Sequence, residues 1–210
     1  MKIGEFLRKG LGPLEKPISE AYRAIFFDLG ALILQIKRWI PGDRLKILEV
    51  GCGEGMLISR LAAAYPDSQI TGIDITPSIG RMYKGDMNHI TFSQQTIMDF
   101  SFKNPESIDL LIIADVMHHV PKEKHKEFLL QARNTLKRGG YIVLKDWARN
   151  KAPIHRLAYF SDRYITGDEV YYRTAEEWRG FLQEAFGRDS IKEEARIRPW
   201  SNNIAFLMQP

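Results

Sequence analysis

The 210-residue chain lacks several features that would place it in a special class. Cys52 is its one cysteine, so no disulfide can form within the chain, and this fits a reducing compartment. No run of about 18 apolar residues is present, so no bilayer-spanning helix is expected. The opening segment MKIGEFLRKG lacks the apolar core of a secretory signal. These absences predict a cytoplasmic location.

A strong charge of one sign is also missing. The formal net charge is +4 and the isoelectric point is about 9.1. This mild basicity is compatible with an anionic partner but does not indicate nucleic acid. With 44% hydrophobic residues, the chain has the composition of an ordinary globular domain with one sizeable core.

Between residues 45 and 146, apolar strand-like runs alternate with helical patterns. The strand candidates are residues 45–52, 69–75, 90–95, 107–116 and 141–146, and the helix candidates are 55–64, 76–85 and 121–137. Thr76 and Pro77 would open the second of these helices, and Gly139 and Gly140 would end the third. The alternation with short connections predicts a parallel sheet with helices on both faces.

Before this region, apolar residues recur at steps of three and four from residue 18 to 40, which predicts one long helix ended by Pro41-Gly42. We interpret residues 1–42 as an N-terminal helical lid over a site in the domain 43–210. The wide apolar face and the Lys37-Arg38-Trp39 end of this helix also permit peripheral membrane contact, which the sequence does not favour over the lid.

After residue 146 the alternation stops. Residues 147–173 are polar, aromatic and irregular, and we interpret them as a cover over a substrate. A helix is predicted for 174–186, where Thr174 and Glu177 have the spacing of a capping box. The tail predicts two strands around a turn at 199–203.

Residues 47–55, ILEVGCGEG, place three glycines at alternate positions directly behind a strand. A glycine turn between a strand and a helix lets the backbone approach a ligand and exposes N–H groups of the helix start. Asp74 ends the next strand about 20 residues later, where a carboxylate can accept hydrogen bonds from ribose hydroxyls. Together they indicate a cofactor that contains a nucleoside.

The pattern differs from the fingerprint of dinucleotide-binding proteins. That fingerprint, G-x-G-x-x-G, needs a third glycine at position 56, where Met56 stands. Glu49, just before the turn, would repel a pyrophosphate, and its charge suits a cofactor with a cationic end.

On these motifs, residues 45–146 resemble the class I S-adenosylmethionine-dependent methyltransferases. The matching segments, in the family's order, are EVGCGEG (49–55), GIDIT (72–76), IMDF (97–100), LLIIADVMHHV (110–120) and LKRGGYIVLKD (136–146). The resemblance implies an α/β fold: a Rossmann-like, doubly wound, mostly parallel seven-stranded sheet with an antiparallel C-terminal hairpin. It also implies S-adenosyl-L-methionine as the cofactor.

The same resemblance implies which residues hold the cofactor. The glycine turn would pass beneath its methionine part, and Asp74 would hold the ribose with Ile75 against the adenine. Asp99 would accept from the adenine amino group, with Phe100 beside it through its backbone N–H. The implied cofactor-binding residues are Glu49, Gly51, Cys52, Gly53, Asp74, Ile75, Asp99, Phe100, Ala114, Asp115 and Val116.

Three residues behind the fourth strand are candidates for a catalytic base: His119, His118 and Asp115. Adjacent residues on a helical turn point about 100° apart, so the two histidines do not easily serve one site. Packing at a helix start is the alternative role for the pair. No further His, Cys and Asp cluster has metal-ligand spacing, so no metal is expected.

The predicted function is methyl transfer to an oxygen, nitrogen or carbon atom of a small, aromatic or lipophilic acceptor. The substrate-binding candidates are Tyr159, Arg163, Tyr164 and Trp200. The fourth strand ends A-D-V-M rather than in the N-P-P-Y type end that the family uses for amino groups of bases, which argues against nucleic acid as a substrate. The alternatives are an NAD(P)-dependent oxidoreductase and a catalytically silent S-adenosylmethionine-binding domain.

Overall fold

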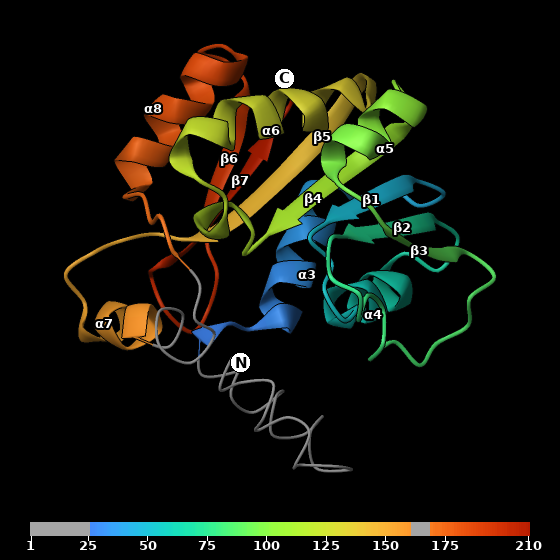
Figure 1. Ribbon diagram of the computed structural model, residues 1–210, viewed down its shortest axis with the longest axis horizontal. Coiled ribbons are helices and arrows are strands. Elements are labelled where there is room, and N and C mark those ends of the chain that lie inside the picture. The colour runs from blue at the N-terminus through green and yellow to red at the C-terminus, as the bar shows by residue number, and fades with distance from the viewer. Residues whose placement is uncertain (1–25, 161–168) are drawn as a thin grey trace.

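The protein, described by a computed structural model over residues 26–160 and 169–210, is built on one seven-stranded sheet (Figure 1). The strands are β1 (Lys46–Val50), β2 (Gln69–Asp74), β3 (Ile90–Gln94), β4 (Ile108–Ala114), β5 (Leu136–Trp147), β6 (Ile191–Arg196) and β7 (Asn203–Met208). Their order is β3-β2-β1-β4-β5-β7-β6, in which β1 to β5 pair in parallel and β7 runs antiparallel to β5 and β6. The predicted Rossmann-like fold with an antiparallel C-terminal hairpin is confirmed.

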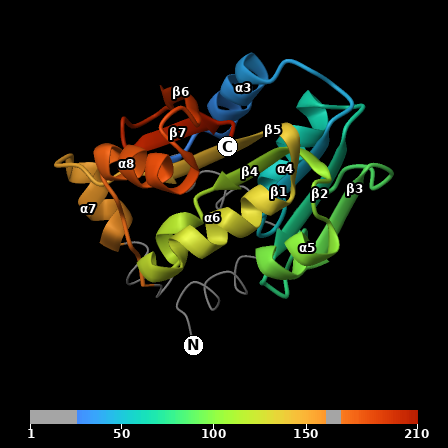
Figure 2. The ribbon, with the colours of Figure 1, turned by 90° about the horizontal axis from the view of Figure 1, so that it is seen from above.

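Helices cover both faces of this sheet. The helices of the described residues are α3 (Leu29–Trp39), α4 (Met56–Ala64), α5 (Ile97–Lys103), α6 (His125–Asn134), α7 (Pro153–Phe160), which lies away from the sheet, and α8 (Ala175–Phe186), with the short 3-10 helices η2 (Met117–His119) and η3 (Lys122–Lys124). Figure 2 shows α3 and α4 on one face and α5, α6 and α8 on the other. The chain therefore has three layers, with one apolar core on each side of the sheet.

The central strand β4 explains why its sequence is a continuous apolar run. Leu110 and Ile112 belong to the core beneath α3 and α4, whereas Leu111 and Ile113 belong to the core beneath α5 and α6. All four side chains are fully buried. Alternate residues of a strand point to opposite faces, so a strand covered on both faces needs apolar side chains throughout.

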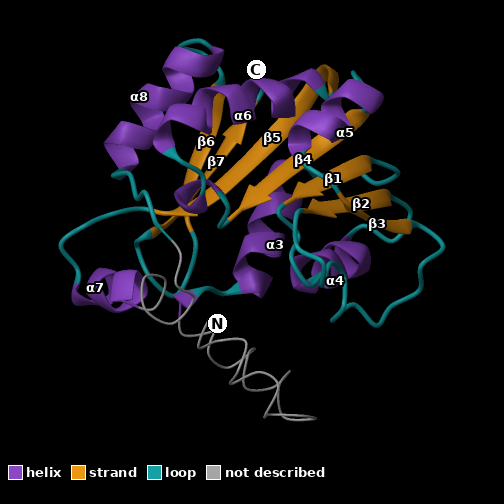
Figure 3. Ribbon diagram, in the orientation of Figure 1, coloured by secondary structure: helices purple, strands orange, loops and turns teal. Residues whose placement is uncertain are grey.

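The predicted helix over residues 76–85 is wrong, because this segment is a series of turns (Figure 3). The Asp74 carboxylate accepts from the Thr76 N–H at 2.8 Å, and Gly80 has a φ of +66°. Gly80 also donates its N–H to the Gly53 carbonyl at 3.0 Å. These bonds to the glycine turn replace the intrahelical bonds that the local sequence favours.

Two other predicted boundaries also differ. The helix expected to run to residue 137 ends at Asn134, and β5 begins at Leu136, so Gly139 and Gly140 lie within the strand. A β-carbon on Gly140 would lie 3.1 Å from the Ile108 carbonyl oxygen, so the strands approach closely there. The helices α5 and α7 were not expected. The capping box of Thr174 and Glu177 at α8 is confirmed.

The long helix expected over residues 18–40 is interrupted within the described part. Phe27 and Asp28 are not helical, and the Asp28 carboxylate caps α3 by accepting from the Ala31 N–H at 2.9 Å. Leu32 and Ile36 are fully buried in the core shared with α4, so α3 is a layer of the domain. Residues 1–25 lie outside the description, and the lid remains a prediction. Within the described ranges, no helix is long and apolar enough to cross a bilayer.

Candidate functional site

The glycine turn after β1 has the backbone geometry that only glycine adopts easily. Gly51 has a φ of +76° and Gly53 a φ of +50°. A β-carbon on Gly51 would lie 2.3 Å from the Val116 Cγ2 atom, a distance that no side chain tolerates. A β-carbon on Gly53 would meet nothing within 4 Å. The turn is therefore tight on one side and open on the other, as a backbone cradle for a ligand requires.

Asp74 connects this turn to the carboxyl end of the neighbouring strand β2. Its Oδ2 atom accepts from the Gly53 N–H at 2.7 Å and its Oδ1 atom from the Thr76 N–H at 2.8 Å. An ionised carboxylate has about four acceptor positions, so two bonds leave capacity for a ligand. The structure thus brings together the predicted glycines and the predicted ribose-binding acid. Ile75, the predicted adenine contact, is 73% exposed beside them.

Glu49 and Cys52 flank the turn from inside the protein. Glu49 is 3% exposed and Cys52 is 6% exposed. Burial, followed by the charges of Glu49 and Asp74, raises the pKa of the Cys52 thiol far above its usual range. A nucleophilic cysteine needs a low pKa, so Cys52 is a packed side chain at the wall of the turn.

The predicted adenine-binding pair Asp99 and Phe100 lies in the first turn of α5. Asp99 forms a capping box with Thr96, whose hydroxyl accepts from the Asp99 N–H at 3.1 Å. Hydrogen bonds from Thr96 lower the pKa of Asp99. The Phe100 N–H donates to the Thr96 carbonyl at 3.1 Å. The Asp99 carboxylate and the Phe100 N–H, which were predicted to contact adenine, therefore form hydrogen bonds at the start of α5. Their contact with a cofactor remains a prediction.

The carboxyl end of β4 carries Ala114, Asp115 and Val116. Val116 packs against the glycine turn, because its Cγ2 atom would lie 2.3 Å from a β-carbon on Gly51. Asp115 has a φ of +56°, a left-handed conformation that is strained for a non-glycine residue. Its two carboxylate oxygens accept from the Lys145 ammonium at 2.6 and 2.7 Å. Sequence reasoning missed Lys145, although a lysine inside the apolar run YIVLKD was a visible signal.

His118 in η2 and Asp146 near the end of β5 form a buried pair. The His118 Nδ1 atom of the ring lies 2.5 Å from the Asp146 Oδ1 atom, and the backbone N–H of His118 donates to Oδ2 at 3.1 Å. Asp146 is fully buried and His118 is 5% exposed. Burial acts to raise the pKa of Asp146, but the charge and hydrogen bond of His118 outweigh it and leave that pKa below its usual value.

This pair has the arrangement of a base and its orienting acid. An ionised carboxylate only accepts hydrogen bonds, so Nδ1 carries a hydrogen whether the ring is charged or neutral, and in the neutral ring Nε2 is the basic nitrogen. His118 therefore has a carboxylate partner of the kind that orients a general base. His119 is exposed, and its ring lies 4.1 Å from that of His118. Sequence reasoning missed Asp146, which is the last residue but one of β5.

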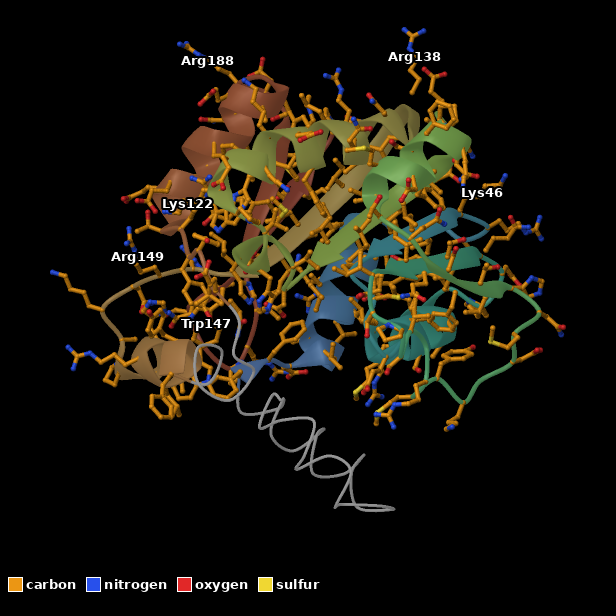
Figure 4. All side chains as sticks on the ribbon, viewed as in Figure 1. Lys46, Lys122, Arg138, Trp147, Arg149 and Arg188 are labelled. Atoms are coloured by element: carbon orange, nitrogen blue, oxygen red, sulfur yellow. The ribbon has the colours of Figure 1, made fainter. Side chains whose placement is uncertain are left out.

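Aromatic side chains surround the pair. The ring of Tyr172 is stacked on His118 with centroids 5.1 Å apart and 20° between the planes. His155 meets Tyr172 edge-on at 5.1 Å and accepts from the Trp147 Nε1–H at 3.0 Å. Phe26 packs edge-on against Trp147 at 6.1 Å. Figure 4 shows Trp147 beside α7, on the side where β4 and β5 end.

Two of the four predicted substrate-binding residues lie within the described residues, and both are exposed. Tyr159 is 45% exposed on α7, and Trp200 is 39% exposed in the turn before β7. Arg163 and Tyr164 lie outside the described residues. Their roles remain predictions, and Trp147 and His155 are the residues of the cluster that sequence reasoning missed.

Comparison with known proteins agrees with this geometry. Residues 47–140 match a family model described as a methyltransferase domain. The chain is 31% identical over 156 residues to 27-O-demethylrifamycin SV methyltransferase of Amycolatopsis mediterranei, covering 71% of this chain and 54% of that protein. It is 26% identical over 110 residues to the ubiquinone biosynthesis O-methyltransferase of Photorhabdus laumondii, covering 50% and 44%.

Solved structures share the fold. The apo form of the S-adenosylmethionine-dependent methyltransferase SibL superposes with a TM-score of 0.68 at 18% identity, over 94% of this chain and 59% of that one. This chain spans about half the length of the curated relatives it matches.

Proposed function

Because the chain belongs to the class I S-adenosylmethionine-dependent methyltransferases, we propose that it transfers a methyl group to an oxygen, nitrogen or carbon atom of a small molecule. One observation carries the proposal. The glycine turn held by Asp74 and the His118–Asp146 pair lie at the carboxyl ends of strands in one sheet, where open α/β sheets bind ligands.

The residues of the turn fit S-adenosylmethionine. The backbone at Gly53 is open on the side that a β-carbon would fill, and Asp74 has acceptor capacity left for two ribose hydroxyls. Glu49 places a negative charge behind the turn, which suits a cationic ligand. When bound, this cofactor supplies an activated methyl group on a positively charged sulfur. The protein then has to align the acceptor with it, and alignment can provide up to roughly 7–11 kcal/mol of the barrier.

His118 takes the acceptor's proton in this proposal. Asp146 holds the imidazole in the tautomer with a basic Nε2 and stabilises the imidazolium that forms. General-base catalysis of this kind contributes about 10²–10⁴-fold. A hydroxyl acceptor is favoured, because such a base is needed only where the acceptor must lose a proton.

The stacked rings around His118 support an aromatic or otherwise apolar acceptor. The Tyr172 ring stacks on His118 and Trp147 directly follows Asp146, so aromatic side chains border the proposed base. The relative from Amycolatopsis mediterranei is named for a methyl transfer to an oxygen of a rifamycin, which is consistent with a hydroxyl of a natural product. We retain the cytoplasm as the predicted compartment.

The test is a methyl-transfer screen with the purified chain. Cofactor carrying an isotope-labelled methyl group is incubated with a panel of phenols and other small hydroxyl compounds, and mass spectrometry detects the labelled product. We expect transfer by the wild type that is lost in Asp74→Ala and in His118→Gln. Binding of NADH without binding of S-adenosylhomocysteine would refute the proposal.

A further inference from the structure

Three side chains at the ends of β4 and β5 form a set that resembles the ligands of a metal ion. Asp115, His118 and Asp146 each offer one ligand atom, and these atoms lie within 4.8 Å of one another. Two carboxylates and an imidazole are ligands that divalent metal ions accept in proteins. A metal ion and a purely organic base are therefore two competing interpretations of the same cluster.

The neighbouring Lys145 decides between them. Its ammonium lies 2.6 and 2.7 Å from the two carboxylate oxygens of Asp115, which is the distance of charge-assisted hydrogen bonds. The residue is 1% exposed and directly precedes Asp146 in β5. The ring of Phe27 lies over the ammonium, with the centroid 3.7 Å from Nζ. Aromatic faces attract cations, so the ammonium is held from both sides.

We propose that the Lys145 ammonium takes the place of a divalent cation in this cluster. The His118–Asp146 pair then works without a metal ion, and loss of the ammonium opens a divalent-cation site made by Asp115, His118 and Asp146. Lys145 is a positioning residue in this account, because it holds the Asp115 carboxylate and keeps it out of metal coordination.

Distance and charge together prevent a metal ion and the Lys145 ammonium from occupying the cluster at the same time. A metal ion binds carboxylate oxygens at about 2.0–2.2 Å, so it would lie directly beside an ammonium that already contacts both oxygens of Asp115. Two positive charges at that separation repel each other strongly in a buried place. The Asp115 backbone N–H also donates to the Lys145 carbonyl at 2.9 Å, which keeps the two residues in register.

The test measures cation binding and does not need the proposed methyl transfer. Mn²⁺ is titrated into the purified chain, and the electron paramagnetic resonance signal of free Mn²⁺ reports the bound fraction. The variants are Lys145→Ala, Lys145→Met, Asp115→Asn, and Lys145→Ala combined with Asp115→Asn. Lys137→Ala is the matched control, since Lys137 lies on the same strand and pairs with Asp109 at 2.7 Å.

We expect both Lys145 variants to bind one equivalent of Mn²⁺ at least about tenfold more tightly than the wild type, because the repulsion between the ammonium and the metal ion is removed. The double variant and Lys137→Ala should show wild-type binding. Two results would overturn the proposal: wild-type binding of Mn²⁺ that Asp115→Asn abolishes, or folded Lys145 variants without a gain in affinity. The first of these is measurable even if the Lys145 variants do not fold.

Discussion

The ends of β1 and β2 and the ends of β4 and β5 form one edge of the sheet but are built differently. At β1 and β2, the turn is made of backbone groups and one acid, Asp74, within about 25 residues of sequence. At β4 and β5, the site consists of side chains from distant segments, among them His118, Asp146 and Tyr172. The first region is readable from a local motif, whereas the second appears only after folding.

The two regions also differ in their proposed roles. In the proposed function, the backbone cradle at β1 and β2 binds the cofactor, and the side-chain cluster at β4 and β5 acts on the acceptor. Substitutions at β1 and β2 should therefore change cofactor affinity, and substitutions at β4 and β5 should change turnover.

The largest expected effect is that of His118→Gln. This change removes the proposed base while Gln retains a polar side chain, so the turnover number should fall by about 10²–10⁴-fold. The affinity for S-adenosylhomocysteine, measured by calorimetry, should stay at the wild-type value. His119→Gln, at the exposed neighbour, is the control and should keep near-normal turnover. Equal losses in both variants would contradict the assignment.

Gly51→Ala tests the glycine turn at the ends of β1 and β2. The new β-carbon would lie 2.3 Å from Val116 Cγ2, and the φ of +76° costs a non-glycine residue roughly 1–2 kcal/mol. We expect the affinity for S-adenosylhomocysteine to fall about tenfold or more, since 1.4 kcal/mol is about a factor of ten. Gly180→Ala on α8, where a β-carbon meets nothing within 4 Å, should leave the affinity unchanged. A Gly51→Ala protein with wild-type affinity for S-adenosylhomocysteine would show that the glycine turn does not bind the cofactor.

Asp74→Asn tests the tether between the turn and β2. An amide nitrogen cannot accept from the Gly53 N–H, and hydrogen bonds to a charged group contribute about 1.5–3 kcal/mol. The cofactor affinity should therefore fall about tenfold, while the turnover number at saturating cofactor changes much less. Saturation kinetics separate the two quantities. A fall in turnover alone would mean that Asp74 belongs to the catalytic region.

The smallest expected effect is the change of the thermal unfolding midpoint with pH. Burial lowers the pKa of His155, and the charge of Arg149 adds to this. The unfolded chain then takes up a proton below about pH 6.5 that the folded chain does not, so stability falls as pH drops through that value. The thermal midpoint should be a few degrees lower at pH 5.5 than at pH 7.5, because each kcal/mol shifts it by roughly 2–4 °C.

His125 contributes in the same direction, because burial lowers its pKa as well. His155→Gln should therefore reduce the pH dependence without removing it. A midpoint that rises toward pH 5.5 would show that these imidazoles gain protons on folding.

Sequence reasoning reached the sheet, its strand directions and the glycine turn, because these depend on local pattern. The continuous apolar run of β4 and the spacing of Gly51, Gly53 and Asp74 were sufficient signals. It failed over residues 76–85, where tertiary hydrogen bonds from the glycine turn override helix propensity.

It also failed to find the partners of His118. Asp146 is 28 residues away in sequence and Tyr172 is 54 away, and no local pattern relates such positions. Parallel pairing of β4 with β5 brings Ala114 opposite Lys145, and this register alone places Asp146 beside η2.

A crystal structure with bound S-adenosylhomocysteine tests the central claim most directly. The account predicts the ribose hydroxyls within hydrogen-bond distance of the Asp74 carboxylate and the homocysteine part over the backbone at Gly51 and Gly53. A nucleoside found away from these two strand ends, for example near the amino ends of the strands, would contradict it.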